Sequence, residues 1–79
     1  MKILFFAHLR KIVGKPEIEI DLQNTLTMDE FWQRLISLHP ALESQRSLVR
    51  LAVNSEFSTP ASCFQNTDEV ALIPPVSGG

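Results

Sequence analysis

The residues with the clearest chemical potential stand together at the end of the sequence, which reads Pro74-Pro75-Val76-Ser77-Gly78-Gly79. Neither proline can continue a β-sheet, because proline has no N–H group and a fixed φ angle. Five extended residues span roughly 16–18 Å at about 3.3–3.6 Å per residue, and glycine has no Cβ to obstruct a narrow channel. The pattern predicts a tail that carries a carboxylate into another protein's active site. A frayed terminus is the alternative.

Other candidate catalytic groups are sparse. His8 and His39, taken with Cys63 and scattered acidic residues, have no spacing typical of a metal site. Cys63 would need a neighbouring general base to act as a nucleophile, so a core or loop position is the simpler interpretation. The sequence has no glycine-rich phosphate loop. We therefore expect no metal and no permanently bound cofactor in this chain.

Size and charge limit the classes of partner. Seventy-nine residues, 44% of them hydrophobic, suffice for one small domain. A formal net charge of −2 argues against nucleic acid as a partner, since phosphate binding needs a basic surface. No apolar run approaches the length of a membrane-spanning helix, so we expect no membrane association. The single cysteine excludes an internal disulfide and favours a reducing compartment, so we expect a cytoplasmic location.

Two segments predict strands that are apolar on both faces. Residues 2–7 alternate to give one face with Ile3, Phe5 and Ala7 and another with Lys2, Leu4 and Phe6. Residues 69–73 do the same, with Val70 and Leu72 toward a helix and Ala71 and Ile73 on the opposite side. Because one helix can cover only one face of the sheet, the other face is a candidate partner-binding patch. Its cover by a loop or by a second copy of the chain is the alternative.

A single main helix is predicted between the strands. Thr27 is a helix N-cap that forms a capping box with Glu30, and Pro40 ends the helix near residue 38. Its apolar face consists of Met28, Phe31, Trp32, Leu35 and Leu38. Residues 17–22 alternate between apolar and acidic side chains, which predicts a strand with one wet face. We expect another strand over residues 48–53, a possible short one near 62–64, and a loop with at most a helical turn over 8–15.

The order of these elements predicts an α+β fold with a mixed sheet of four to five strands and one main helix across one face. The first and last strands, both apolar on two sides, pair beside each other at the centre of the sheet. This is the β-grasp arrangement of ubiquitin-like proteins. We expect a β-grasp domain over residues 1–74 and a flexible C-terminal tail over residues 75–79.

Three stretches of sequence carry a family resemblance. They are Leu4-Phe5-Phe6-Ala7 with Arg10 and Gly14, the triplet Ala52-Val53-Asn54, and the ending Asp68-Glu69-Val70-Ala71 followed by Pro74 to Gly79. Together they resemble the small subunit of molybdopterin synthase, a ubiquitin-like sulfur carrier. The turn over residues 66–68 and the loop over 57–64 depart from the pattern of that family.

The resemblance implies that Gly79 donates sulfur. A carboxylate is unreactive toward sulfur nucleophiles until it becomes an acyl-adenylate, whose AMP is a good leaving group. An adenylyltransferase of the ubiquitin-activating type would use ATP to adenylate Gly79, and a desulfurase or rhodanese type of donor would supply the sulfur. The thiocarboxylate would then enter the large subunit of a heterotetrameric enzyme and build the dithiolene of the molybdenum cofactor from a cyclic pterin precursor. This chain would be the subunit without a catalytic pocket.

The resemblance also implies a function for the sheet face that the helix does not cover, as the surface that binds the large subunit. Leu4, Phe6, Ala71 and Ile73 would surround the root of the tail, and Arg10 would add a polar contact at the rim. Pro74 and Pro75 would reduce the entropy that the tail loses on binding, and Val76, Ser77 and Gly78 would enter the partner with Gly79. Two alternatives stay open: a sulfur carrier for thiamin thiazole or tRNA thiolation, and a ubiquitin-like modifier joined to lysines.

Overall fold

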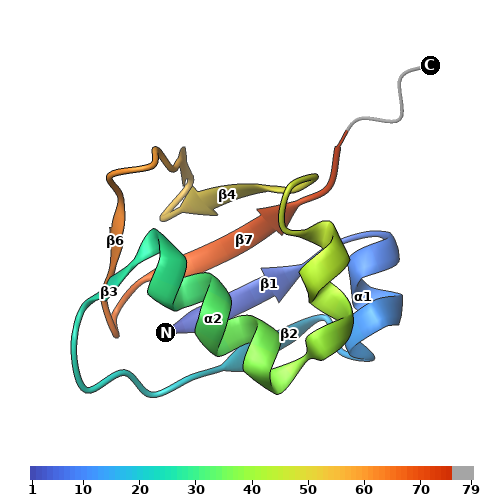
Figure 1. Ribbon diagram of the computed structural model, residues 1–79, viewed down its shortest axis with the longest axis horizontal. Helices are drawn as coiled ribbons and strands as arrows, with labels where there is room; N and C mark the ends of the chain where they lie inside the picture. Colours follow the sequence, from blue (N-terminus) through green and yellow to red (C-terminus); the bar gives the residue numbers. More distant parts are fainter. Residues whose placement is uncertain (76–79) are drawn as a thin grey trace.

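A five-stranded mixed sheet with one long helix across it forms the framework of the computed structural model, which describes residues 1–75 (Figure 1). The strands of the sheet are β1 (Lys2–Phe5), β2 (Glu17–Glu19), β4 (Arg50–Val53), β5 (Glu56–Phe57) and β7 (Glu69–Ile73), in the spatial order β2-β1-β7-β4-β5. Strands β3 (Leu26–Thr27) and β6 (Cys63–Phe64) form a separate antiparallel pair. The predicted α+β fold with a mixed sheet is confirmed.

The first and last strands lie at the centre of this sheet, as the sequence predicts. β1 and β7 run parallel, with Ile3 opposite Val70 and Phe5 opposite Leu72. All four of these side chains are fully buried. β2 and β4 then pair antiparallel with the outer edges of β1 and β7. The start of the chain and the segment that leads to its end are therefore joined in one buried ladder.

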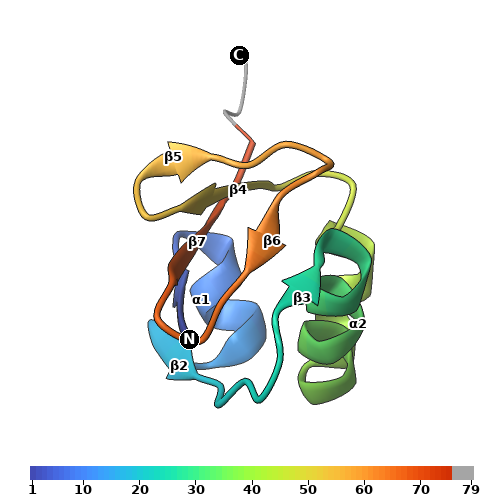
Figure 2. The ribbon, with the colours of Figure 1, turned by 90° about the vertical axis from the view of Figure 1, so that its left-hand side faces the viewer.

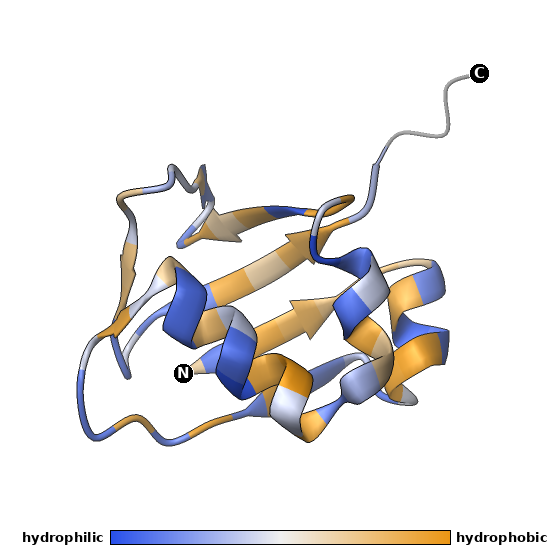
Figure 3. Ribbon diagram, viewed as in Figure 1, coloured by the Kyte–Doolittle hydropathy of each residue, from blue (hydrophilic) through white to orange (hydrophobic). Residues whose placement is uncertain are grey.

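Helix α2 (Met28–Leu38) covers one face of the sheet, which we call the inner face (Figure 2). The capping box is present: the Thr27 hydroxyl accepts a hydrogen bond from the Glu30 N–H at 3.2 Å, and the Glu30 carboxylate accepts one from the Thr27 N–H at 2.9 Å. The buried side chains of α2 itself are those of Phe31, Trp32 and Leu35. Figure 3 shows the hydrophobic β1 and β7 behind the mainly hydrophilic first turns of α2.

A second helix, α1 (His8–Val13), occupies the segment for which a loop with at most a helical turn is predicted. Leu9 is fully buried, and Ile12 and Val13 pack against the core, so the segment has its own helical spacing. Gly14 ends the helix with a left-handed φ of 83°, and its N–H donates to the Arg10 carbonyl at 2.7 Å. Six residues are too few for this pattern to stand out in the sequence.

The prediction that Leu38 belongs to the buried face of the helix is wrong. Its side chain is 52% exposed, because α2 ends at this residue and the chain turns away. The following 3₁₀ helix η1 (Pro40–Gln45) places the fully buried Leu42 in the core instead.

The predicted strand boundaries also need correction. β1 ends at Phe5, and Ala7 lies in a turn with a positive φ of 51°, where the Leu9 N–H donates to the Phe6 carbonyl at 3.0 Å. β2 ends at Glu19 and not at residue 22. β3 and β5, each of only two residues, were not predicted.

A tight turn at Asn54 and Ser55 joins β4 to β5. Both residues have positive φ, 51° and 73°, a combination that asparagine tolerates better than most residues. The Asn54 side-chain amide donates to the Asp68 carboxylate at 2.9 Å, and its oxygen accepts from the Glu69 N–H at 2.9 Å. Asn54 therefore ties this turn to the beginning of β7.

We predict that Asn54→Ala lowers the free energy of unfolding by about 1–2 kcal/mol, because it removes both hydrogen bonds and places alanine at positive φ. Urea denaturation measures the change. Asn24→Ala, which alters another exposed asparagine in a loop, is the control and should stay within about 0.5 kcal/mol of the unaltered chain. Equal stability of the two variants would contradict the role of Asn54.

Candidate functional site

The side of the sheet opposite α2, which we call the outer face, carries the candidate docking residues. Side chains alternate along each strand, so the residues next to the buried Ile3, Phe5, Val70 and Leu72 point outward. The outward residues Leu4, Ala71 and Ala52 are register partners across β1, β7 and β4. The structure leaves these three residues, together with Phe6 and Ile73, half-buried. The predicted division of the two faces is therefore confirmed within β1 and β7, whereas Ala7, which was predicted on the inner face, is exposed in the turn after β1.

Phe6 and Arg10 lie together on one side of the root of the tail. Phe5 is opposite Leu72 in the parallel ladder, so the next residues along the two segments are Phe6 and Ile73. The Arg10 guanidinium donates through Nε to the Phe5 carbonyl at 2.9 Å, and its central carbon lies 5.7 Å from the centroid of the Phe6 ring. Helix α1 holds Arg10 in this position, so the structure brings these two predicted site residues together.

A second aromatic residue, Phe57, lies on the other side of the tail root and is absent from the predicted site. Arg50 is the register partner of Ile73, and its guanidinium carbon lies 3.8 Å from the centroid of the Phe57 ring. Phe57 is the partner of the outward-facing Ala52, and its side chain is 55% exposed. The available signal was the turn at Asn54, since a tight turn after an apolar strand predicts a returning strand.

The structure describes the last residue of the domain, Pro74, and the first residue of the tail, Pro75. β7 ends at Ile73, and neither Pro74 nor Pro75 belongs to a strand, as expected for residues that cannot extend a ladder. Pro74 is half-buried and Pro75 is exposed. The predictions for Val76, Ser77, Gly78 and Gly79 lie outside the described residues.

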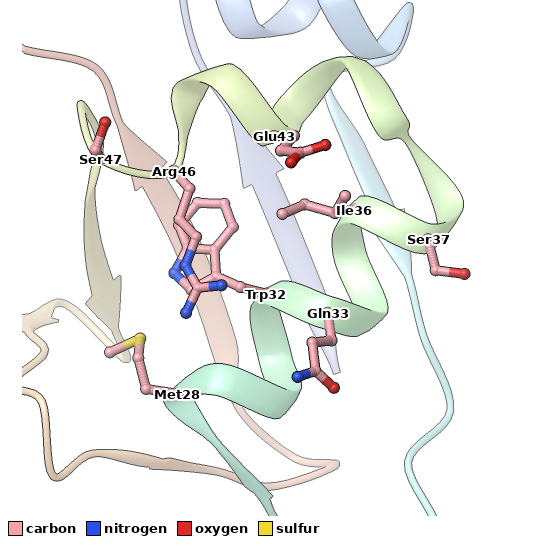
Figure 4. Close-up of a pocket in the computed structure, with 8 residues that line it drawn as sticks. All are labelled: Met28, Trp32, Gln33, Ile36, Ser37, Glu43, Arg46 and Ser47. Atoms are coloured by element: carbon pink, nitrogen blue, oxygen red, sulfur yellow. The ribbon is translucent and has the colours of Figure 1, made fainter.

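A large groove lies away from the outer face. It is a groove of about 770 Å³ between α2 and the segment that contains η1 (Figure 4). Trp32 and Ile36 line its apolar part, and Arg46 lies over the Trp32 ring and pairs with Asp29. The groove is built from the helix side of the molecule, so it does not adjoin the residues of the outer face.

Over residues 1–75, no three His, Cys, Asp or Glu side chains are grouped so that they could hold a metal ion. Cys63 is exposed and makes only a long contact of 3.9 Å with the Ala61 carbonyl. No helix among these residues has the length and apolar character needed to cross a membrane.

Comparison with known proteins decides the family. The model of the ThiS family matches residues 3–79, which is nearly the whole chain. The chain belongs to the ThiS family. This ThiS-family chain is 38% identical over its full length to the molybdopterin synthase sulfur carrier subunit of Arabidopsis thaliana, of which the match covers 82%.

Solved structures give the same fold for this ThiS-family chain. The crystal structure of SAMP1 from Haloferax volcanii matches it with a TM-score of 0.85 and 30% identity, covering 100% of this chain and 98% of that one. A chain in the complex of subunits 1 and 2 of the molybdopterin-converting factor from Helicobacter pylori matches with a TM-score of 0.66 over 99% of this chain and 96% of that one. At 18% identity this second likeness shows the fold alone. The fold is the ubiquitin-like β-grasp that the sequence predicts.

We predict that two neighbouring residues of β7 respond differently to truncation. Leu72→Ala should lower the free energy of unfolding by about 2–5 kcal/mol, because Leu72 is fully buried on the inner face. Ile73→Ala should cost less than about 1.5 kcal/mol, because Ile73 lies half-buried on the outer face. Urea denaturation of both variants measures the difference, and the reverse order would overturn the assignment of the faces.

Proposed function

We propose that this chain is the sulfur carrier subunit of a molybdopterin synthase and that Gly79 carries the sulfur. The observation that carries the proposal is the half-buried apolar surface around Ile73 and Pro74, from which the Gly-Gly ending continues. The family match, which extends to residue 79, and the name of the Arabidopsis thaliana relative support it. We also propose a cytoplasmic location, because a chain with one free cysteine suits a reducing compartment.

The chemistry of the proposal needs two steps before sulfur is delivered. A carboxylate oxygen of Gly79 attacks the α-phosphorus of ATP on an adenylyltransferase of the ubiquitin-activating type, and pyrophosphate leaves. Hydrosulfide then attacks the acyl carbon, the bond between that carbon and the AMP oxygen breaks, and a thiocarboxylate remains on Gly79. If the donor carries its sulfur as a persulfide, the same attack leaves an acyl disulfide on Gly79, and a thiol reductant cleaves the S–S bond to leave the thiocarboxylate. Glycine suits both steps because the absence of a Cβ lets the backbone pass closely through a narrow channel. ATP is consumed by the activating enzyme and is not bound by this chain.

The outer face is the surface that we propose docks on the large subunit. Phe6 exposes apolar area on the same side of the tail root as its neighbour Ile73, and Phe57 exposes apolar area on the other side, against Arg50, the register partner of Ile73. Burial of this area would fix the direction in which the tail leaves the sheet. The complex of two subunits in the Helicobacter pylori structure shows that a protein of this fold is found with a second subunit.

A ubiquitin-like modifier is the second candidate function. The observation that favours it is the likeness to SAMP1, since a protein with 30% identity to this chain is named small archaeal modifier protein 1. Both functions begin with an acyl-adenylate and differ in the group that attacks it, which is a sulfur nucleophile in a carrier and a lysine amine in a modifier.

We predict that the chain purified from its host contains a form about 16 Da heavier, because sulfur replaces oxygen at Gly79. Intact-mass spectrometry measures the change. Removal of Gly79, or addition of a residue after it, should abolish this form and leave the melting temperature unchanged. Cys63→Ser is the control and should keep the heavier form, which excludes oxidation of the thiol to a sulfenic acid, a change that also adds about 16 Da. Adducts on lysines of other proteins, without a thiocarboxylate, would support the modifier.

We predict that Phe57→Ser weakens binding to the large subunit by about tenfold, because it removes an exposed aromatic ring from the proposed docking surface. Isothermal titration calorimetry measures the affinity, and thermal unfolding should change little because the ring is 55% exposed. Leu38→Ser is the matched control, with 52% exposure at the end of α2, and should leave the affinity unchanged. Equal losses in the two variants would contradict docking on the outer face.

A further inference from the structure

The charges of the outer face are unevenly distributed along β7. Toward the end where β7 begins, Lys2 lies between its register partners Glu19 and Glu69 and also pairs with Glu17, so acidic side chains outnumber basic ones there. Arg50 and Arg10 lie at the other end, beside Ile73 and the root of the tail. The chain as a whole carries a formal charge of −2, so these two arginines form a local positive region on a chain that is negative overall. The outer face is therefore polarised along the direction in which the tail leaves.

Arg50 has no carboxylate partner within residues 1–75. The ion pairs of the described chain join Lys2 to Glu17 and Arg46 to Asp29. Arg50 instead lies over the exposed ring of Phe57, with its central carbon 3.8 Å from the ring centroid. A guanidinium stacked in this way loses few hydrogen bonds and keeps its fork of N–H groups free for a carboxylate. Arg46, by contrast, lies over Trp32 but already has its acidic partner.

We propose that Arg50, held by Phe57, is a specificity-determining residue that pairs with a carboxylate of the large subunit at the entrance to the channel for the tail. The proposal rests on the proposed function and adds to it the charge of the matching surface. Charge complementarity at an interface sets the orientation and the rate of encounter. A large subunit with acidic side chains at this entrance is accepted, and one with basic side chains there is rejected. The apolar residues supply contact area, and Arg50 fixes which end of the face meets the entrance.

The test measures association and dissociation of the full chain with the large subunit by surface plasmon resonance at several salt concentrations. Arg50→Glu should weaken binding by about tenfold or more, mainly through slower association, and Arg50→Gln should weaken it less. The affinity of Arg50→Gln should also fall less steeply as salt rises than that of the unaltered chain. Arg50→Lys should recover part of the affinity, because it restores the charge without the planar stack.

Arg34→Glu is the matched control, since it makes the same change of charge at an exposed position of α2 and should leave binding nearly unchanged. Equal losses for Arg34→Glu and Arg50→Glu would overturn the proposal, because net charge alone would then explain the effect. Unchanged binding of Arg50→Glu, beside weakened binding of Phe57→Ser, would also overturn it and leave a purely apolar docking face. Absence of binding by the unaltered chain would instead be a failure of the proposed function.

Discussion

The parallel pairing of β1 with β7 is the constraint on which the rest of the molecule depends. The ladder begins where the Lys2 N–H donates to the Asp68 carbonyl at 3.0 Å and extends to the pair of Phe5 and Leu72. Its inward side chains are fully buried beneath α2, and a close-packed core leaves a strand little freedom to slide or tilt. A shift by one residue would turn every apolar side chain of β7 to the other face. The place where β7 ends is thus fixed by the core and not by the tail.

The two paired strands also place apolar residues on the outer face. β1 and β7 carry apolar side chains on both faces, and the long helix α2 covers only one of them. The free protein partly covers the outward aromatic rings with its own arginines, since Arg10 lies over Phe6 and Arg50 over Phe57. Long arginine side chains shield apolar surface while their charge stays in water. The arrangement limits the apolar area exposed to solvent and keeps a cation on each side of the tail root.

Regular local patterns made most of the framework predictable from the sequence. Strict alternation identified the central strands, and it assigned Val70 and Leu72 to the inner face and Ala71 and Ile73 to the outer face. The spacing of Thr27 and Glu30 identified the start of the helix. The errors fall where an element is short or depends on tertiary contacts. The two residues of β5 are too few to show a period, so the turn at Asn54 and Ser55 did not by itself identify the strand that returns after it. The predicted site therefore contained Phe6 and Arg10 but missed Phe57 and Arg50.

A carrier of this design separates chemistry from recognition. Gly79 provides the reacting group in the proposal, whereas the rigid domain provides a fixed base and an oriented docking surface. Docking first raises the effective concentration of the tail in the partner's site, so the tail itself needs little affinity. The fold cannot by itself decide between a carrier and a modifier, because relatives with both names share it. Discrimination has to come from side chains that vary on a constant framework, and the polarised outer face, with Arg50 stacked on Phe57 beside the tail, is where this chain places such side chains.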